Sequence, residues 1–192
     1  MKILVIQNRM GIGDMVIFLP YIEEISKKFN SPITLLTKES SKAKEYLSNN
    51  NNIEDIIDLK RNSDDDHHQG LKGFLRLTKD LKKFNFDKAF IFNSSVRYNL
   101  VCKFAGVKKI YQYPLFKKRK QHIVDAAKNL LKKINLNVES DPKIYIEESS
   151  VISAKEKFNI NDKQINILLG IGGSGPTKRT PADIIIEFIK LS

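Results

Sequence analysis

The sequence is poor in cysteine, in long apolar runs and in acidic side chains. Its single cysteine, Cys102, excludes an internal disulfide and favours a reducing compartment. No stretch approaches the ~20 apolar residues of a transmembrane helix, and the N-terminal apolar run is too short for a signal peptide and lacks a small-residue cleavage site. We therefore expect a cytoplasmic protein with Cys102 in its core rather than at a catalytic site.

The shortage of acidic residues leaves the chain strongly basic. Lys and Arg number 33 against 22 Asp and Glu, which gives a net charge of +11. Such an excess favours an anionic partner, which would be nucleic acid, a membrane surface or a phosphorylated substrate. The alternative is that the charge is only a solvated surface. The 192 residues suffice for one domain with a core, or for one domain and part of a second.

Short apolar runs alternate with amphipathic segments along the chain. Apolar residues at three- and four-residue spacing predict helices between the runs, including one continuous helix from Asp14 to Phe29. This alternation predicts an α/β fold, a Rossmann-like parallel sheet with helices on both faces. The predicted strands lie in residues 3–6, 33–37, 53–59, 86–92, 109–113 and 164–171.

The pattern of strand, glycine turn and helix begins a second time near residue 164. We therefore expect an N-terminal Rossmann-like domain over residues 1–163, followed at 164–192 by the first strand, turn and helix of a second, truncated domain. A single strand–helix unit does not bury both of its faces. The alternative is therefore that this last unit packs back on the first domain.

The first predicted strand is followed by Gly11, Gly13 and Asp14, and then by a helix. The glycines suit a tight reversal, and the order of elements puts Asp14 at the carboxyl edge of the sheet, where open α/β sheets bind ligands. Val16 replaces the third glycine of a dinucleotide fingerprint, and a carboxylate at the helix mouth would repel a pyrophosphate, so we reject a standard NAD site. Asp14 is then either a helix cap or a general base.

The second glycine turn, at residues 170–176, is followed by Lys178 and Arg179. Small residues let backbone amides approach an anion, which the two cations can neutralise. It is not a Walker loop, because Thr177 precedes the lysine. We interpret it as a phosphate-binding loop, and the alternative is a flexible interdomain turn.

Both glycine turns, taken with their flanks, resemble glycosyltransferase family 9, the lipopolysaccharide heptosyltransferase family. The likeness covers nearly the whole chain, but only the family's N-terminal half and the first motif of its second half. Thr180 stands where the family usually has a tryptophan. The residues that carry the resemblance are the run at 2–6, Gly13-Asp14-Met15-Val16, the helix from His122, and Gly172-Gly173-Ser174 with Lys178-Arg179-Thr180-Pro181.

The resemblance implies a GT-B fold of two facing Rossmann-like halves that carries out inverting sugar transfer without a metal or a cofactor. An anionic, lipid-linked saccharide of the lipopolysaccharide-core type would bind the N-terminal half, and a nucleotide-sugar, often ADP-heptose, the other half. Asp14 would be the general base. The donor-phosphate loop would contain Gly172, Gly173, Ser174, Thr177 and Lys178.

Further candidates are less specific. Arg97 and Tyr98 follow the fourth strand and are expected at the same sheet edge as Asp14. We predict that Gly13, Arg97 and Tyr98 bind the anionic acceptor, and the alternative is that Arg97 and Tyr98 are ordinary surface residues. The basic run at 117–120 could attract a phosphorylated lipid or the cytoplasmic face of the inner membrane, although a solvated loop is the simpler interpretation. Residues 64–68, Asp-Asp-Asp-His-His, offer metal ligands, but consecutive loop residues seldom converge on one ion, so we expect no metal site.

The sequence thus predicts a glycosyltransferase, with this 192-residue chain inactive when alone. The alternative from another class is a non-catalytic basic α/β module that binds nucleic acid or an anionic surface. The chain lacks the interleaved aromatic residues and reading motifs of nucleic-acid-binding proteins. We therefore expect no nucleic-acid partner.

Overall fold

The computed structural model describes residues 1–9, 11–61, 66–115, 121–172 and 179–191. The chain divides into two compact units, Met1–Ile146 and Glu147–Ser192. The first contains the whole sheet and both apolar cores. The predicted domain boundary after residue 163 stays a prediction.

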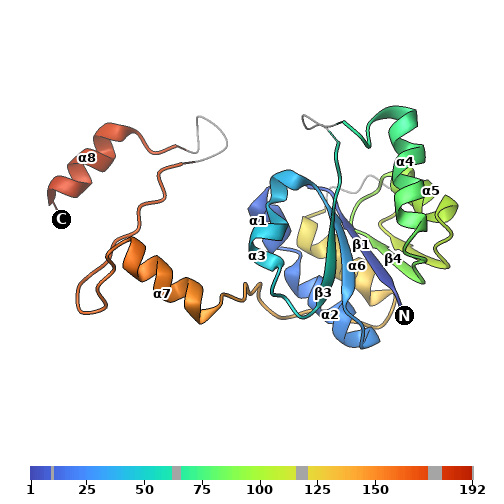
Figure 1. Ribbon diagram of the computed structural model, residues 1–192, viewed down its shortest axis with the longest axis horizontal. Helices are drawn as coiled ribbons and strands as arrows, with labels where there is room; N and C mark the ends of the chain where they lie inside the picture. Colours follow the sequence, from blue (N-terminus) through green and yellow to red (C-terminus); the bar gives the residue numbers. More distant parts are fainter. Residues whose placement is uncertain (10, 62–65, 116–120, 173–178, 192) are drawn as a thin grey trace. The chain divides into compact units, whose positions relative to one another are not determined.

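One five-stranded parallel sheet forms the centre of the first unit (Figure 1). Its strand order is β3-β2-β1-β4-β5, so the chain runs outward from β1 in one direction and then in the other. Such a reversal creates a crevice at the carboxyl ends of the central strands. The α/β fold predicted for this part is confirmed. The strands are β1 (Ile3–Gln7), β2 (Ile33–Thr37), β3 (Ile53–Asp58), β4 (Lys88–Ile91) and β5 (Lys109–Gln112).

Helices cover both faces of the sheet, and β1 is buried from both sides. Ile3 and Val5 belong to the core under α2 (Leu19–Phe29) and α6 (Ile123–Lys132). Leu4 and Ile6 belong to the core under α4 (Gly70–Lys82) and α5 (Val96–Phe104). Cys102 lies in the second core, where burial raises the pKa of its thiol to about 12. Its predicted core role is confirmed.

The first predicted helix is divided into two. Helix α1 (Ile12–Val16) ends before α2 begins at Leu19, with Pro20 in the first turn of α2. Proline has no N–H to bond the preceding turn, and it is well tolerated only where a helix starts. The segment after β2 forms the 3₁₀ turn η1 (Glu39–Ser41) and the short helix α3 (Ala43–Leu47).

The second unit contains α7 (Glu148–Lys157) and α8 (Ala182–Leu191). The strand predicted at residues 164–171 is wrong, because these residues have no regular structure and are exposed. A strand must pair its backbone groups with a neighbouring strand, and the described residues of this unit include none.

None of the helices among the described residues has the length and apolarity required to cross a membrane.

Candidate active site

The carboxyl ends of β1, β4 and β5 are joined by a network of side-chain amides. Asn93 Nδ2 donates to Asn8 Oδ1 at 3.2 Å. Gln112 Nε2 donates to the backbone oxygens of Asn93 and Ser95, at 3.0 and 2.9 Å. These bonds fix the loops that follow the strands, so this edge is a rigid base for a binding site.

Gln7, the last residue of β1, positions the loop that leads to Asp14. Its buried side chain donates through Nε2 to the backbone oxygen of Asp14 at 3.0 Å. Its Oε1 accepts from the backbone N–H of Arg9 at 2.5 Å. Sequence reasoning missed Gln7, although a polar residue that ends an apolar buried strand was a usable signal.

The carboxylate of Asp14 lies at the predicted sheet edge and is partly accessible. Its side chain is 37% exposed, and Oδ1 lies 3.7 Å from Nη1 of Arg9. Asp14 is the third residue of α1, whereas the N-terminal cap is Gly11 and makes no side-chain capping bond. Side-chain capping therefore does not account for Asp14, although an acid in the first turn still interacts favourably with the helix dipole.

The glycines before Asp14 do not serve the tight reversal expected of them. Gly11 has a φ of −100°, and the described glycines with positive φ are Gly70 and Gly106. A Cβ placed on Gly13 would meet nothing within 4 Å. Gly13 therefore leaves open space beside Asp14, and its predicted contact with an acceptor stays a prediction.

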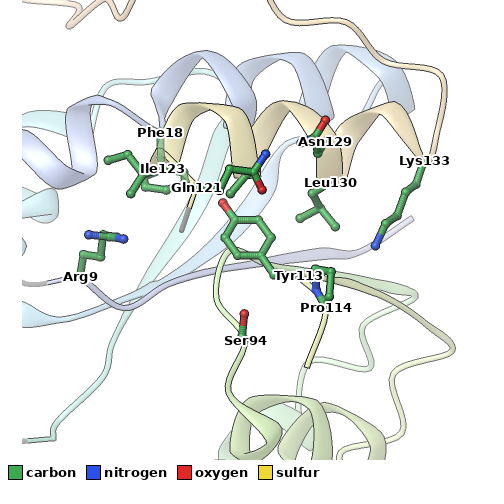
Figure 2. Close-up of a pocket in the computed structure, with 11 residues that line it drawn as sticks. Arg9, Phe18, Ser94, Tyr113, Pro114, Gln121, Ile123, Asn129, Leu130 and Lys133 are labelled. Carbon is green, nitrogen blue, oxygen red and sulfur yellow. The ribbon is translucent and has the colours of Figure 1, made fainter. Parts of the chain in front are cut away.

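A pocket of about 520 Å³ lies at the same edge, within the range of small-molecule sites. Figure 2 shows Arg9 toward one end, Lys133 toward the other and Tyr113 between them. Sequence reasoning missed the pocket, because its walls come from segments far apart in the chain. The described residues that line it are Arg9, Phe18, Ser94, Tyr113, Pro114, Gln121, Ile123, Ala126, Asn129, Leu130 and Lys133.

Tyr113 offers this pocket a hydrogen-bond donor. Its hydroxyl oxygen is buried and has no hydrogen-bond partner within the described part of the chain. Burial raises the pKa of the phenol, so the hydroxyl keeps its proton. Lys133 uses one of its three N–H groups on the backbone oxygen of Gln112, at 3.0 Å. The pocket thus combines two cations, a neutral donor and apolar walls.

Arg97 and Tyr98 lie at the predicted edge, but both have structural contacts. The guanidinium of Arg97 donates to the backbone oxygens of Gly70 and His68, at 2.9 and 2.8 Å, and burial lowers its pKa. Tyr98 is buried, and its hydroxyl accepts from Asn8 Nδ2 at 3.5 Å. Neither lines the pocket, and their binding of an acceptor stays a prediction.

The histidines at 67 and 68 meet Asp80, which sequence reasoning did not connect with them. Nε2 of His68 lies 3.5 Å and Nε2 of His67 4.0 Å from Asp80 Oδ2, close enough for a metal cluster. However, Nδ1 of His68 accepts from the backbone N–H of Lys60 at 3.1 Å. That bond leaves the proton of the neutral ring on Nε2, where a metal would have to bind. The geometry favours a histidine–carboxylate contact over a metal site.

Several predicted residues fall outside the described part of the chain. They are Asp64 and Asp65, the basic run at 117–120, and Gly173, Ser174, Thr177 and Lys178. Gly170 and Gly172 are described, and a Cβ on either would meet nothing within 4 Å. The donor-phosphate role of this turn stays a prediction.

Comparisons with known proteins identify the fold. No protein-family model and no curated protein matches the sequence. A glycosyl transferase family 9 structure from Veillonella parvula matches 99% of this chain and 60% of its own, with 20% identity and a TM-score of 0.75. The E. coli ADP-heptose lipopolysaccharide heptosyltransferase II matches 100% of this chain and 62% of its own, with 18% identity and a TM-score of 0.69.

A third structure, E. coli heptosyltransferase WaaC with ADP-2-deoxy-2-fluoro heptose, has 15% identity and a TM-score of 0.63. It covers 100% of this chain and 65% of its own length. The chain therefore spans about three fifths of the structures it matches. At these identities the likeness shows a shared fold, and the predicted fold class is confirmed.

Proposed function

We propose that this chain is part of a family 9 glycosyltransferase that moves a sugar from a nucleotide-sugar to a saccharide acceptor, with Asp14 as general base. The observation that carries the proposal is the position of Asp14. Its partly exposed carboxylate lies at the carboxyl edge of the central strand, 3.7 Å from an arginine that also lines the pocket. This edge is where ligands bind in open α/β sheets.

The reaction needs a base on one side of the sugar and an anion stabiliser on the other. The acceptor hydroxyl gives its proton to Asp14 as its oxygen bonds to the anomeric carbon. The bond from that carbon to the diphosphate breaks at the opposite face, so the configuration inverts. Lys178 and the amides of its glycine turn would stabilise the charge on the departing nucleotide.

The pocket suits an anionic saccharide acceptor. Arg9 and Lys133 can pair with phosphate or carboxylate groups, while Tyr113 donates to a sugar oxygen. Pro114 is exposed and Ile123 is half-buried, and both offer the pocket apolar surface for the faces of sugar rings. We infer a lipid-linked acceptor of the lipopolysaccharide-core type, reached at the cytoplasmic face of the inner membrane.

The donor is inferred from the structural neighbours. The printed names of the two E. coli structures include ADP-heptose and ADP-2-deoxy-2-fluoro heptose. We infer ADP-heptose as the donor, with its diphosphate at the turn containing Gly172 and Lys178.

The test is transfer from ADP-heptose to a lipopolysaccharide-core acceptor by the protein expressed from the whole reading frame. Asp14→Asn removes the base with little change in shape, and we expect kcat to fall about 10²- to 10⁴-fold. Glu148→Gln, which removes an acid from the first turn of α7, is the matched control and keeps full activity.

Undiminished turnover by Asp14→Asn would contradict the base assignment. Failure to transfer from any nucleotide-sugar, together with salt-sensitive binding to DNA or RNA, would favour the nucleic-acid module instead.

A further inference from the structure

Helix α4 carries two leucines on the side that faces away from the core. Leu71 is 85% exposed and Leu75 is 66% exposed. They are one turn apart and therefore lie side by side. The helix already buries Leu77 and Leu81 in the core that it shares with the sheet, so the core does not account for the outer leucines.

Helix α5 extends this apolar area. Phe74 of α4 meets Phe104 of α5 edge-on, with ring centroids 6.0 Å apart, and Phe104 is 63% exposed. Leu100 lies one turn before Phe104 and is also exposed. Figure 1 shows the two helices next to each other at one side of the first unit. We call this area, formed by Leu71, Phe74, Leu75, Leu100 and Phe104, the α4–α5 surface.

Basic residues border the leucines. At 100° per residue, Lys72, Arg76 and Lys79 lie on the side of Leu71 and Leu75 opposite to Phe74, and all three are exposed. Helix α5 has no acidic residue, and α4 has only Asp80. That carboxylate is 2.8 Å from Lys83 Nζ and 3.5 Å from His68 Nε2. The border of the surface is therefore positively charged.

We propose that the α4–α5 surface docks on an anionic lipid bilayer. The apolar side chains enter the interface between headgroups and acyl chains, and the three cations contact lipid phosphates. Helices that lie in a membrane interface typically carry exposed leucine and phenylalanine beside lysine and arginine. The proposal does not depend on sugar transfer and does not use the basic run at 117–120.

Charge favours lipid over a second copy of this chain. In a symmetric dimer the same patch meets itself, which would bring the rows of Lys72, Arg76 and Lys79 close to their own copies. Like charges at short range oppose that association. An anionic bilayer supplies the complementary charge together with an apolar layer.

The experiment measures co-sedimentation of the full 192-residue chain with vesicles of phosphatidylcholine, with and without phosphatidylglycerol. We expect binding that requires phosphatidylglycerol. Leu71→Ser with Leu75→Ser removes the apolar contact, and Lys72→Glu with Arg76→Glu reverses two border charges. Each pair is expected to weaken binding at least about tenfold, because one pair loses buried apolar surface and the other loses attraction to lipid phosphates.

The matched control is Val151→Ser with Ile152→Ser, which removes two exposed apolar side chains from α7 and is expected to leave binding unchanged. Circular dichroism and thermal melting verify that every variant folds. Unchanged binding by the leucine pair would overturn the proposal. So would a dimer of the unaltered chain, seen by sedimentation in the absence of lipid, that the leucine pair abolishes.

Discussion

The side-chain amide of Gln7 donates a hydrogen bond to the backbone oxygen of Asp14 across 3.0 Å. Gln7 ends the central strand and Asp14 lies in the first turn of α1, so one buried side chain spans the loop between them. Gln7 does not line the pocket. It is a positioning residue for the proposed base.

Replacing Gln7 by methionine keeps the volume but removes both hydrogen bonds. The backbone N–H of Arg9 and oxygen of Asp14 then lose a partner, and an unsatisfied buried group costs about 1–3 kcal/mol. We expect the free energy of unfolding, measured in urea, to fall by this amount. If Asp14 is the general base, the Gln7→Met variant should lose more in kcat than it gains in KM, because the base loses its alignment.

Gln69→Met is the matched control for Gln7. The Gln69 side chain accepts an exposed hydrogen bond from Arg61 Nε at 2.8 Å, and exposed bonds contribute little to stability. Equal loss of stability in the two variants would contradict the bracing role of Gln7.

Tyr113→Phe separates ligand binding from folding. The Tyr113 hydroxyl is buried and has no hydrogen-bond partner among the described residues, so its removal should leave stability unchanged or raise it by up to about 1 kcal/mol. If the hydroxyl binds the acceptor, the acceptor KM should rise about tenfold, the loss of one hydrogen bond. Because the pKa of this phenol is raised, its effect should not vary between about pH 6 and 9, a range that lies wholly below the ordinary tyrosine pKa of about 10.

Tyr46→Phe provides the contrast to Tyr113. Its hydroxyl donates to the backbone oxygen of Ser41 at 3.1 Å, so its loss should cost about 0.5–1.5 kcal/mol of stability without changing the acceptor KM. An unchanged KM in Tyr113→Phe would contradict the acceptor pocket.

Gly13→Ala tests whether the open space beside Asp14 serves a ligand. Alanine meets no atom there within 4 Å and stabilises a helix by up to about 1 kcal/mol relative to glycine. We therefore expect a higher melting temperature together with weaker acceptor binding, measured by calorimetry. Unimpaired binding would show that the acceptor does not approach this position.

Gly73→Ala should destabilise the protein, in contrast to Gly13→Ala. Its Cβ would lie 2.1 Å from the backbone carbon of His68, so the loop before α4 must move. This variant should unfold at a lower temperature than the unaltered protein.

The strands of the sheet could be predicted from the sequence because each one has a local pattern of apolar residues. The uninterrupted apolar run at residues 3–6 predicts a strand buried on both faces, and the structure agrees. The same reasoning failed at residues 164–171, where a segment rich in isoleucine and leucine has no partner strand among the described residues. A local pattern shows that a segment can pair, but pairing is a tertiary interaction.

Only part of the candidate site could be predicted from the sequence, for the same reason. Asp14 follows from the order of strand, turn and helix. Tyr113 and Lys133 join Arg9 only because β4 connects β5 to β1 in the sheet and α6 packs in the same core as β1. Asp80 meets His68 only because the loop before α4 folds back on that helix. No spacing along the chain predicts these contacts.

The burial of His68 makes stability depend on pH. Burial is the main cause that lowers the pKa of His68 below its ordinary value of 6.5, although Asp80 opposes it. The unfolded chain therefore takes up a proton at a higher pH than the folded chain does. The contribution of His68 is complete above about pH 6.5 and is lost as pH falls toward the lowered folded-state pKa.

Urea unfolding at a series of pH values measures this dependence. We expect the free energy of unfolding to decline below about pH 6.5 and the decline to flatten in His68→Gln. His122→Gln is the control, because His122 is exposed, and it should keep the decline. Asp80, whose pKa is lowered, loses its contribution only as pH falls below about 4, the ordinary range of aspartate, so it does not account for a change near pH 6. An unchanged decline in His68→Gln would assign the pH dependence to other groups.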